Sequence, residues 1–407
     1  MRAIVFGVLI ACAAVCAGAA SSETHPNMTR EIHGLHGPVK TCMTEAKYET
    51  EGVGFSSETV EFDREGRLVR TSGRYPSQPE WSTTYVFDEQ GRVLRETSTQ
   101  GTTTTWEKVN SYDEVGRLSK VTTSGGLRGD STTVYEYGPE GRLVMEEDTS
   151  KRGVSRTEYR HENGRKTMVK TVPAQAESQG AVGIGADILM ESAITGDYGL
   201  PQGGTVTAVF DEQDRPVEAK LANPQGVVHT RIVRTYDAQG RIAQTRSIME
   251  DPLAMFAAEL PKELASADPA QLEMMKAAMM RMIGGNKGAT SITNKYDKLG
   301  RVIERKTTVL GSRDHVQAMA YNEHGDLVSE KTDMDTNPDA VTGVSTDEMG
   351  NIVETRGEGP PPMHSESKFD YQYDSFRNWT EKTVYLRASP DDEFKRTTVM
   401  RRTITYY

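Results

Sequence analysis

A short motif returns along this chain at an almost constant interval of about 25 residues, and this repetition limits the possible folds more than any other feature. The motif is aromatic–Asp–x–x–Gly–Arg–aliphatic, and clear copies begin at Phe62, Phe87, Tyr112, Tyr137, Tyr236 and Tyr296. Weaker copies begin at Phe210, Tyr321, Thr346 and Tyr373, and a worn copy begins at Tyr159. A recurrence of this length identifies a repeat protein, in which each copy is one supersecondary unit.

Each copy carries the signals of a β-hairpin. The Asp side chain can accept a hydrogen bond from the backbone two residues on, and the Gly suits the left-handed position of a three-residue loop. This register sets the aromatic residue opposite the aliphatic one, as in Tyr112 opposite Leu118. We therefore predict structural turn roles for Asp63, Gly66, Asp88, Gly91, Asp113, Gly116, Gly141, Asp237, Gly240, Asp297, Gly300, Gly325 and Gly350.

Consecutive hairpins predict an all-β fold, a curved or spiralling antiparallel hairpin-repeat sheet with a small inserted helical segment. Roughly ten hairpins are expected to form at most a partial curl. Two copies depart from the motif. Asp214 takes the Gly position of its copy and Pro216 follows, which predicts an edge or a distorted turn. Arg377 takes the Gly position of the Tyr373 copy, and we expect a register shift that places Asn378 in the left-handed position.

Composition excludes some classes of function. Hydrophobic residues make up only 36% of the chain and charged residues 26%, which suits a thin two-sided sheet better than a thick core. The formal charge of −11 argues against nucleic-acid binding, which needs a basic face. The eight His are scattered and no nucleophile-elbow, zinc-protease or phosphate-loop motif is present, so we predict a protein without enzymatic activity and without a cofactor.

The N-terminus has the pattern of a secretory signal peptide. Arg2 precedes an apolar run that ends in small residues near Ala19, which predicts cleavage there and export to the periplasm, the cell surface or the medium. Two alternatives are a lipid anchor at Cys12 and an uncleaved membrane anchor. No later stretch is apolar enough to span a bilayer, so we expect no membrane span after signal removal. Cys42 then remains alone, without an internal disulfide.

The intervals between copies divide the chain. We predict a signal peptide (1–20), N-terminal strands (21–57), a first repeat block (58–172), an insertion (173–204), a second block (205–250), a Met-rich helical insertion (251–288) and a third block (289–407). In the second insertion Asp268 and Pro269 begin a helix that Gly284 ends, with an apolar face that we expect to cover the sheet.

Trp81 and Trp106 are the candidate ligand-binding residues. They lie about 25 residues apart, each six residues before the aromatic residue of its copy, so both are expected on the motif face with rings roughly 9.5 Å apart. Indoles on a sheet can bind sugar rings, although such residues are more often simply packed beneath a cover.

The copies at Tyr112 and Tyr236 carry Tyr-Asp-x-x-Gly-Arg-Leu and Tyr-Asp-x-x-Gly-Arg-Ile, and the motif resembles the YD repeat of the RHS family. The resemblance covers most of residues 58–383 outside the insertions. The resemblance implies a spiralling β-sheet. In the family, which includes wall-associated proteins and toxin shells, such a sheet can close into a hollow shell, and carbohydrate binding is proposed for some members. This chain is much shorter, without a match to the family's self-cleaving core or a toxin domain, so encapsulation and autoproteolysis are not expected.

The leading prediction is therefore an exported, non-enzymatic repeat protein of bacterial type that serves as a structural or binding scaffold at the cell envelope or outside the cell. Its partner is unknown, with carbohydrate or an envelope or extracellular protein as the expected classes and nucleic acid excluded. The first alternative is a carbohydrate-binding module that uses Trp81 and Trp106. The second is a hydrolase whose site lies at the two insertions.

Overall fold

Polar and apolar residues alternate on both sides of each motif turn, and these stretches form pairs of antiparallel strands. The structure is a computed structural model that describes residues 28–49, 56–126, 129–162, 164–174, 203–255, 289–309, 313–334, 341–346, 352–356 and 363–407, with residues 190, 191, 194, 200, 273, 274, 276 and 277. The elements are β1 (Val39–Tyr48), β2 (Ser56–Phe62), β3 (Leu68–Arg74), β4 (Trp81–Phe87), β5 (Val93–Gln100), β6 (Thr103–Tyr112), β7 (Leu118–Gly125), β8 (Ser131–Tyr137), β9 (Leu143–Ser150), β10 (Gly153–Glu162), β11 (Arg165–Val172), β12 (Gly204–Phe210), β13 (Pro216–Ala222), β14 (Val228–Tyr236), β15 (Ile242–Met249), α2 (Pro252–Met255), β16 (Ala289–Tyr296), β17 (Val302–Val309), β18 (Arg313–Tyr321), β19 (Leu327–Met334), β20 (Val341–Thr346), β21 (Ile352–Arg356), β22 (Met363–Tyr373), β23 (Trp379–Arg387) and β24 (Lys395–Tyr406).

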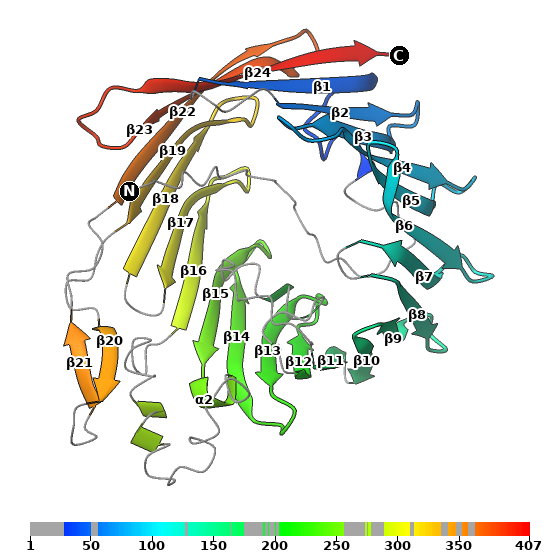
Figure 1. Cartoon of the computed structure of the whole chain (residues 1–407), viewed down its shortest axis with the longest axis vertical. Helices are drawn as coiled ribbons and strands as arrows, with labels where there is room; N and C mark the ends of the chain where they lie inside the picture. The colour runs from blue at the N-terminus through cyan, green and yellow to red at the C-terminus, as the bar shows by residue number, and fades with distance from the viewer. Residues whose placement is uncertain are drawn as a thin grey trace.

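The strands form one closed antiparallel sheet of 22 strands. Neighbours in the sheet follow chain order except at two places: β19 pairs with β22, and β1 pairs with β24 as well as with β2. The β1–β24 pairing closes the sheet, so the chain forms a ring of strands around a central space (Figure 1). The all-β prediction is confirmed, whereas the open spiral and the partial curl are wrong. Closure removes both free edges, which are otherwise sites of unwanted pairing.

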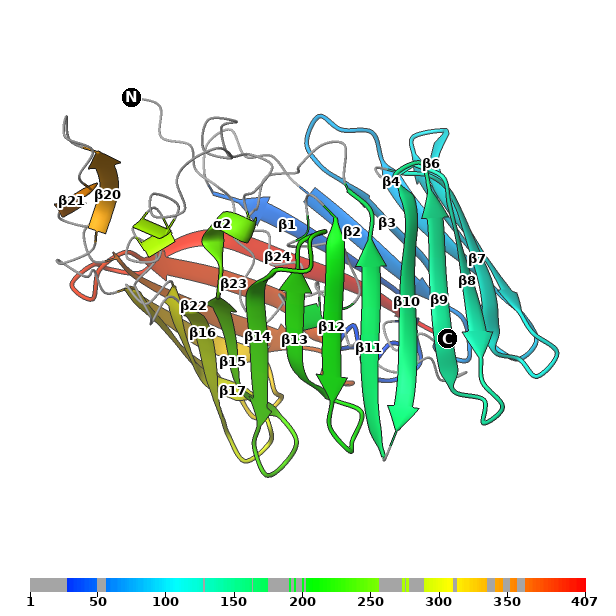
Figure 2. The ribbon, with the colours of Figure 1, turned by 90° about the horizontal axis from the view of Figure 1, so that it is seen from below.

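The ring has two different rims. The motif turns that join β2 to β3, β4 to β5 and the later pairs all lie at one rim, which we call the turn rim (Figure 2). The described elements α2 and β20–β21 lie at the opposite rim, which we call the insertion rim (Figure 2). This separation follows from the antiparallel order, because every second connection returns the chain to the same rim.

The register within the hairpins is the one that the motif predicts. Phe87 pairs with Val93 and Tyr112 pairs with Leu118, in each case beside an irregularity that bends the strand. The face that carries these motif residues looks into the ring, and we call it the inner face. Outward positions such as Val86 and Val154 are about half exposed, at 50% and 49%.

Two hydrophobic clusters lie on the inner face. In one, Met190 and Leu200 of the first insertion pack on β11, β12, β13 and β14 against residues such as Val206 and Ile232. In the other, the N-terminal residues Met28 and Leu35 pack against the β1, β2 and β3 residues Val39, Cys42, Val60, Phe62 and Leu68. Segments outside the repeats therefore cover part of the apolar inner face.

One motif copy does not join the ring. The copy that begins at Thr346 forms a separate two-stranded sheet, β20 with β21, and β19 pairs directly with β22. The constant interval predicts that each copy pairs with the next one along the chain, and this order is interrupted here.

The two irregular copies are more regular than the sequence predicts. Asp214 adopts a φ of 60° in the Gly position, and the turn keeps the usual bonds from Asp211 N to Arg215 O and from Asp214 N to Asp211 O, at 2.9 and 3.1 Å. Its strand β13 pairs on both sides, so the predicted edge is wrong; Pro216 is tolerated as the first residue of the strand. In the Tyr373 copy Arg377, not Asn378, takes the left-handed conformation, with a φ of 68°.

The helix predicted in the second insertion lies mostly outside the described residues. The structure describes α2, with helical residues at 190, 191, 194, 273, 274, 276 and 277, and it does not support a Met-rich helix that packs on the sheet. Met274 is 52% exposed, whereas Met275, Met279 and Met282 lie outside the described residues. Within the described part of the chain, no helix is long and apolar enough to cross a membrane.

Candidate functional site

The polar residues of the motif bind one another within each turn. In the second copy, Asp88 accepts hydrogen bonds from the backbone N and the Nε of Arg92, at 2.8 and 2.6 Å. Gly91 N donates to Asp88 O at 3.0 Å, and Gly91 has a φ of 79°, a left-handed conformation that glycine adopts without a Cβ penalty. Burial opposes ionisation of Asp88, but the hydrogen bonds from Arg92 outweigh it and lower the pKa of this carboxyl.

The arginine of each turn also reaches the next copy. The Arg92 guanidinium lies over the Tyr112 ring at 4.4 Å, and the same contact recurs in pairs separated by about 20 residues or by an insertion. The pairs are Arg67–Phe87, Arg117–Tyr137, Arg215–Tyr236, Arg241–Tyr296 and Arg301–Tyr321. Each contact places a cation on the face of an aromatic ring, which is favourable by roughly 0.5–2 kcal/mol.

The tyrosine hydroxyl adds a second bond between copies. Tyr112 Oη donates to Val93 O at 2.8 Å, and Tyr137 Oη donates to Leu118 O at 2.8 Å. The turn glycine leaves space for the preceding arginine, since a Cβ on Gly116 would lie 2.9 Å from Arg92 Nη1. The aromatic, Asp, Gly and Arg positions therefore all serve contacts along the turn rim.

The structure places the predicted turn residues in these turns wherever it describes them. The glycines at positions 66, 91, 116, 141, 240, 300 and 325 all have positive φ values. The carboxylates at positions 63, 88, 113, 237 and 297 accept from their own arginines. Gly350 lies outside the described residues. Sequence reasoning missed the arginine contact to the next copy, although the recurring Arg-to-aromatic spacing contained that signal.

The closing strands use a modified turn. Asn378 takes the arginine position of the Tyr373 copy and is fully buried. It accepts from His36 N at 2.7 Å and donates to His36 O and to Tyr406 Oη, both at 2.9 Å. Tyr406 Oη in turn donates to Asp374. The turn between β22 and β23 is thus hydrogen-bonded to both the N-terminal segment and the last strand, close to the β1–β24 seam that closes the sheet.

Trp81 and Trp106 both lie on the inner face, but they are not level. Trp81 pairs with Gln100 while Trp106 pairs with Ser98, so the two are offset by two residues along the strands. Two strand spacings with this offset place their Cα atoms roughly 12 Å apart, more than the sequence-based 9.5 Å. Each indole packs against glycine: a Cβ on Gly73 would lie 2.8 Å from the Trp81 ring, and one on Gly126 would lie 3.5 Å from Trp106 Cβ.

Ionisable groups also line the inner face. Tyr85 pairs across the sheet with Glu96, which pairs with Lys108. Burial raises the pKa of Tyr85 to about 12 with a further contribution from the Glu96 charge, and burial also raises the pKa of Glu96 against the opposing Lys108 charge. Burial raises the pKa of Glu146 in the same way, opposed by Lys170. These groups lie in pairs, and no set of three or more possible metal ligands occurs in the described residues.

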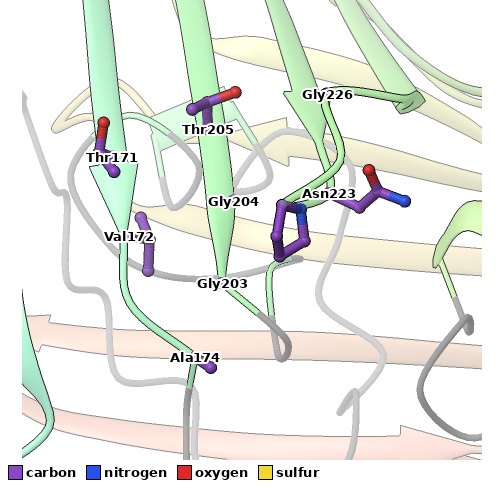
Figure 3. Close-up of a pocket in the computed structure, with 9 residues that line it drawn as sticks. Thr171, Val172, Ala174, Gly203, Gly204, Thr205, Asn223 and Gly226 are labelled. Atoms are coloured by element: carbon purple, nitrogen blue, oxygen red, sulfur yellow. The ribbon is translucent and has the colours of Figure 1, made fainter.

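A shallow pocket of about 380 Å³ lies at the insertion-rim ends of β11, β12 and β13 (Figure 3). Its lining is short side chains and backbone, with Thr171, Val172, Gly203, Gly204 and Asn223 among them. Figure 3 shows Thr171 and Thr205 on neighbouring strands and Asn223 across from them. None of the lining residues is ionisable, so the lining offers no charged acid or base that could activate the hydroxyl of Thr171 or Thr205.

No protein-family model and no curated protein matches this sequence. Among solved structures, the chain is similar to a chain in the crystal structure of TcdB2-TccC3-Cdc42, with 11% identity over 83% of this chain and a TM-score of 0.36. This chain spans only 15% of that one. It is also similar to porin-like proteins from Bacteroides uniformis ATCC 8492, with 10% identity, 91% and 99% coverage and a TM-score of 0.27, and from Bacteroides vulgatus ATCC 8482, with 9% identity, 91% and 98% coverage and a TM-score of 0.19.

Proposed function

We propose that this protein is an exported, non-enzymatic scaffold of the cell envelope or extracellular space, in which the closed sheet is a rigid frame for binding. The observation that carries the proposal is that polar motif residues are used in structural contacts: Asp88 binds Arg92 within its turn, and Arg92 and Tyr112 contact the neighbouring copy. Residues committed to such contacts build a frame and are not free for chemistry. Export itself follows from residues 1–20, which lie outside the described part of the chain, as does Cys12.

The hydrolase alternative finds no support in the described residues of the insertions. Glu191 forms an ion pair with the buried Arg234, and Lys276 Nζ lies 2.6 Å from Asp251 Oδ2. Both pairs fasten an insertion to the sheet or to its neighbouring segment, and neither places a free acid or base beside a nucleophile.

The binding alternative that a specific observation favours is a carbohydrate-binding inner face at Trp81 and Trp106. Trp81 packs against Gly73, Trp106 packs against Gly126, and both side chains are only partly buried. Trp379 differs, because the Arg402 guanidinium lies 3.7 Å from its ring centroid and occupies that ring. Aromatic rings on a rigid sheet offer the flat apolar surface that sugar rings stack on.

The test uses the purified mature protein and isolated envelope glycans. We expect saturable co-sedimentation with peptidoglycan or surface polysaccharide and no release of soluble sugar or peptide fragments. Catalytic turnover in a broad hydrolase screen would show that the frame proposal is wrong. The double variant Trp81→Ala, Trp106→Ala should lose retention, while Tyr75→Ala, which removes an aromatic residue that is 37% exposed, should keep it. Equal retention by both variants excludes the sugar-binding face.

A further inference from the structure

A cluster of charged and aromatic residues lies on the inner face where the ring closes. Arg402 of β24 is opposite Thr44 of β1, and Thr44 is opposite Glu58 of β2. The three residues therefore form a row across the closing strands. Closure brings them together from opposite ends of the chain, so the arrangement exists only in the closed sheet.

Arg402 is held in place by an aromatic ring and lacks acceptors. Its guanidinium lies 3.7 Å from the centroid of the Trp379 ring, and this contact fixes the position of the cation. Its Nε and Nη1 atoms are buried, and neither has a hydrogen-bond partner among the described residues. Buried donors of a charged group are costly without an acceptor, and a guanidinium is suited to carboxylate and phosphate oxygens.

A second unpartnered nitrogen belongs to a separate element of the same region. His33, in the segment that covers this part of the inner face, has a buried Nε2 atom without a partner in the described chain. Its ring lies edge-on to Phe62 with centroids 5.6 Å apart. Phe62 and Glu58 lie on the same face of β2, and Glu58 is in the row of Thr44 and Arg402, so His33 covers the face that carries Arg402. Burial lowers the pKa of His33, and the Arg402 charge lowers it further.

The nearby carboxylates do not supply the missing acceptors. Asp326 accepts a hydrogen bond from Tyr373 Oη at 2.7 Å. Glu58 is exposed to solvent. Burial raises the pKa of the Glu58 carboxyl, and the Arg402 charge lowers it by less. Burial also lowers the pKa of Arg402 against the attraction of these groups. The Arg402 Nε and Nη1 donors therefore remain without an acceptor, although carboxylates lie close enough to act on the Arg402 charge.

We propose that Arg402 and His33 form an oxyanion-binding site on the inner face at the β1–β24 closure, which takes a carboxylate or phosphate group of a small ligand. The oxyanion accepts from the Arg402 donors and from a protonated or Nε2–H form of His33. Because Arg402 lies on β24 and His33 precedes β1, the bound group joins both sides of the closure. The site shares no residue with the Trp81 and Trp106 face, so each can fail without the other.

The test is isothermal titration of the purified full chain with sodium acetate, sodium glucuronate and sodium phosphate, with sodium chloride at matched ionic strength as the reference. We expect binding above the chloride reference. Acetate and glucuronate without phosphate would assign a carboxylate ligand, and phosphate alone would assign a phosphate ligand. Arg402→Met should weaken binding about tenfold or more, because charged hydrogen bonds are lost. The matched control is Arg401→Met on the outward face, where Arg401 is 68% exposed and paired with Glu381, and it should bind as wild type.

A second measurement does not depend on the folding of a variant. The pKa of His33, followed by NMR in the wild-type chain, should rise when the bound anion saturates the site. No binding above chloride, equal binding by Arg402→Met, or a His33 pKa that the anion leaves unchanged would each overturn the proposal.

Discussion

The contact between Arg92 and Tyr112 tests whether the turn arginines hold neighbouring copies together. Arg92 is 24% exposed and its Nε lies 2.6 Å from Asp88 Oδ2, while its guanidinium covers the Tyr112 ring at 4.4 Å. Arg92→Met keeps a long apolar stem and removes both polar contacts. Tyr112→Leu keeps an apolar residue opposite Leu118 and removes the ring and the hydroxyl bond to Val93 O.

The expected magnitude follows from these contacts. The cation–ring contact contributes about 1 kcal/mol and the partly buried ion pair about 0.5 kcal/mol, so Arg92→Met should lower the free energy of unfolding by about 1.5 kcal/mol. Only the cation–ring contact is shared by the two variants. The double variant should therefore be less destabilised than the sum of the single variants, by about 1 kcal/mol.

The assay is urea unfolding of the four proteins, followed by circular dichroism and tryptophan fluorescence, whose coincidence tests the two-state assumption. Arg95→Met is the matched control. Arg95 is 54% exposed on the outward face and its only described ion pair is to Glu107 at 3.4 Å, so its removal should cost less than about 0.5 kcal/mol. Additivity of Arg92→Met and Tyr112→Leu within about 0.3 kcal/mol would refute the view that arginine couples the copies.

Three further predictions concern a turn, the seam and pH. Gly116→Ala should destabilise the protein more than Gly325→Ala. Both glycines have a positive φ, but only a Cβ at Gly116 would meet another side chain, with Arg92 Nη1 at 2.9 Å. The urea midpoints of the two variants measure the difference. Asn378→Ala should lower the free energy of unfolding by about 2 kcal/mol or more, since it leaves His36 N without its buried acceptor. In this variant, hydrogen exchange should show faster opening of β24 than of β15. Acidification from about pH 7.5 to 5.5 should destabilise the protein, because burial lowers the pKa of His229 below 6.5, against the Asp251 charge, and the unfolded chain takes up the proton first. His229→Gln should make the free energy of unfolding less dependent on pH in this window, and the dependence that remains comes from His33, whose pKa burial also lowers.

The hairpins could be predicted from sequence because their determinants are local. A turn such as Asp88 to Arg92 closes within five residues, and the bulge that sets Phe87 opposite Val93 follows from the glycine position. The inner-face position of Trp81 follows from the same alternation. The level of Trp106 does not, because it depends on where the β5–β6 connection places the strand and on an additional irregularity between β5 and β6 that shifts the register by one residue.

Contacts between copies were harder to predict from sequence, because they depend on which copy becomes the neighbour. Arg241 reaches Tyr296 across the whole second insertion, as closely as Arg92 reaches Tyr112. The oxyanion cluster is more distant still, since Arg402, Trp379 and His33 carry no common motif. Only closure of the sheet brings the first and last parts of the chain together.

The arginine position holds a short polar residue in the copy before the β19–β22 junction and in the last copy before the sheet closes. At the β19–β22 junction this position holds Asp326, which accepts from Tyr373 Oη, and at the closing seam it holds Asn378, which donates to Tyr406 Oη. In both places the hydroxyl of the neighbouring tyrosine points at the turn. A short carboxylate or amide side chain can hydrogen-bond that hydroxyl, whereas an arginine at the same position would place its guanidinium over the ring. Tyr371 then makes the usual hydroxyl bond, to Leu327 O. In these two copies a short polar residue therefore replaces the turn arginine where the neighbouring tyrosine directs its hydroxyl at the turn, which connects a local sequence change to the way the strands meet there.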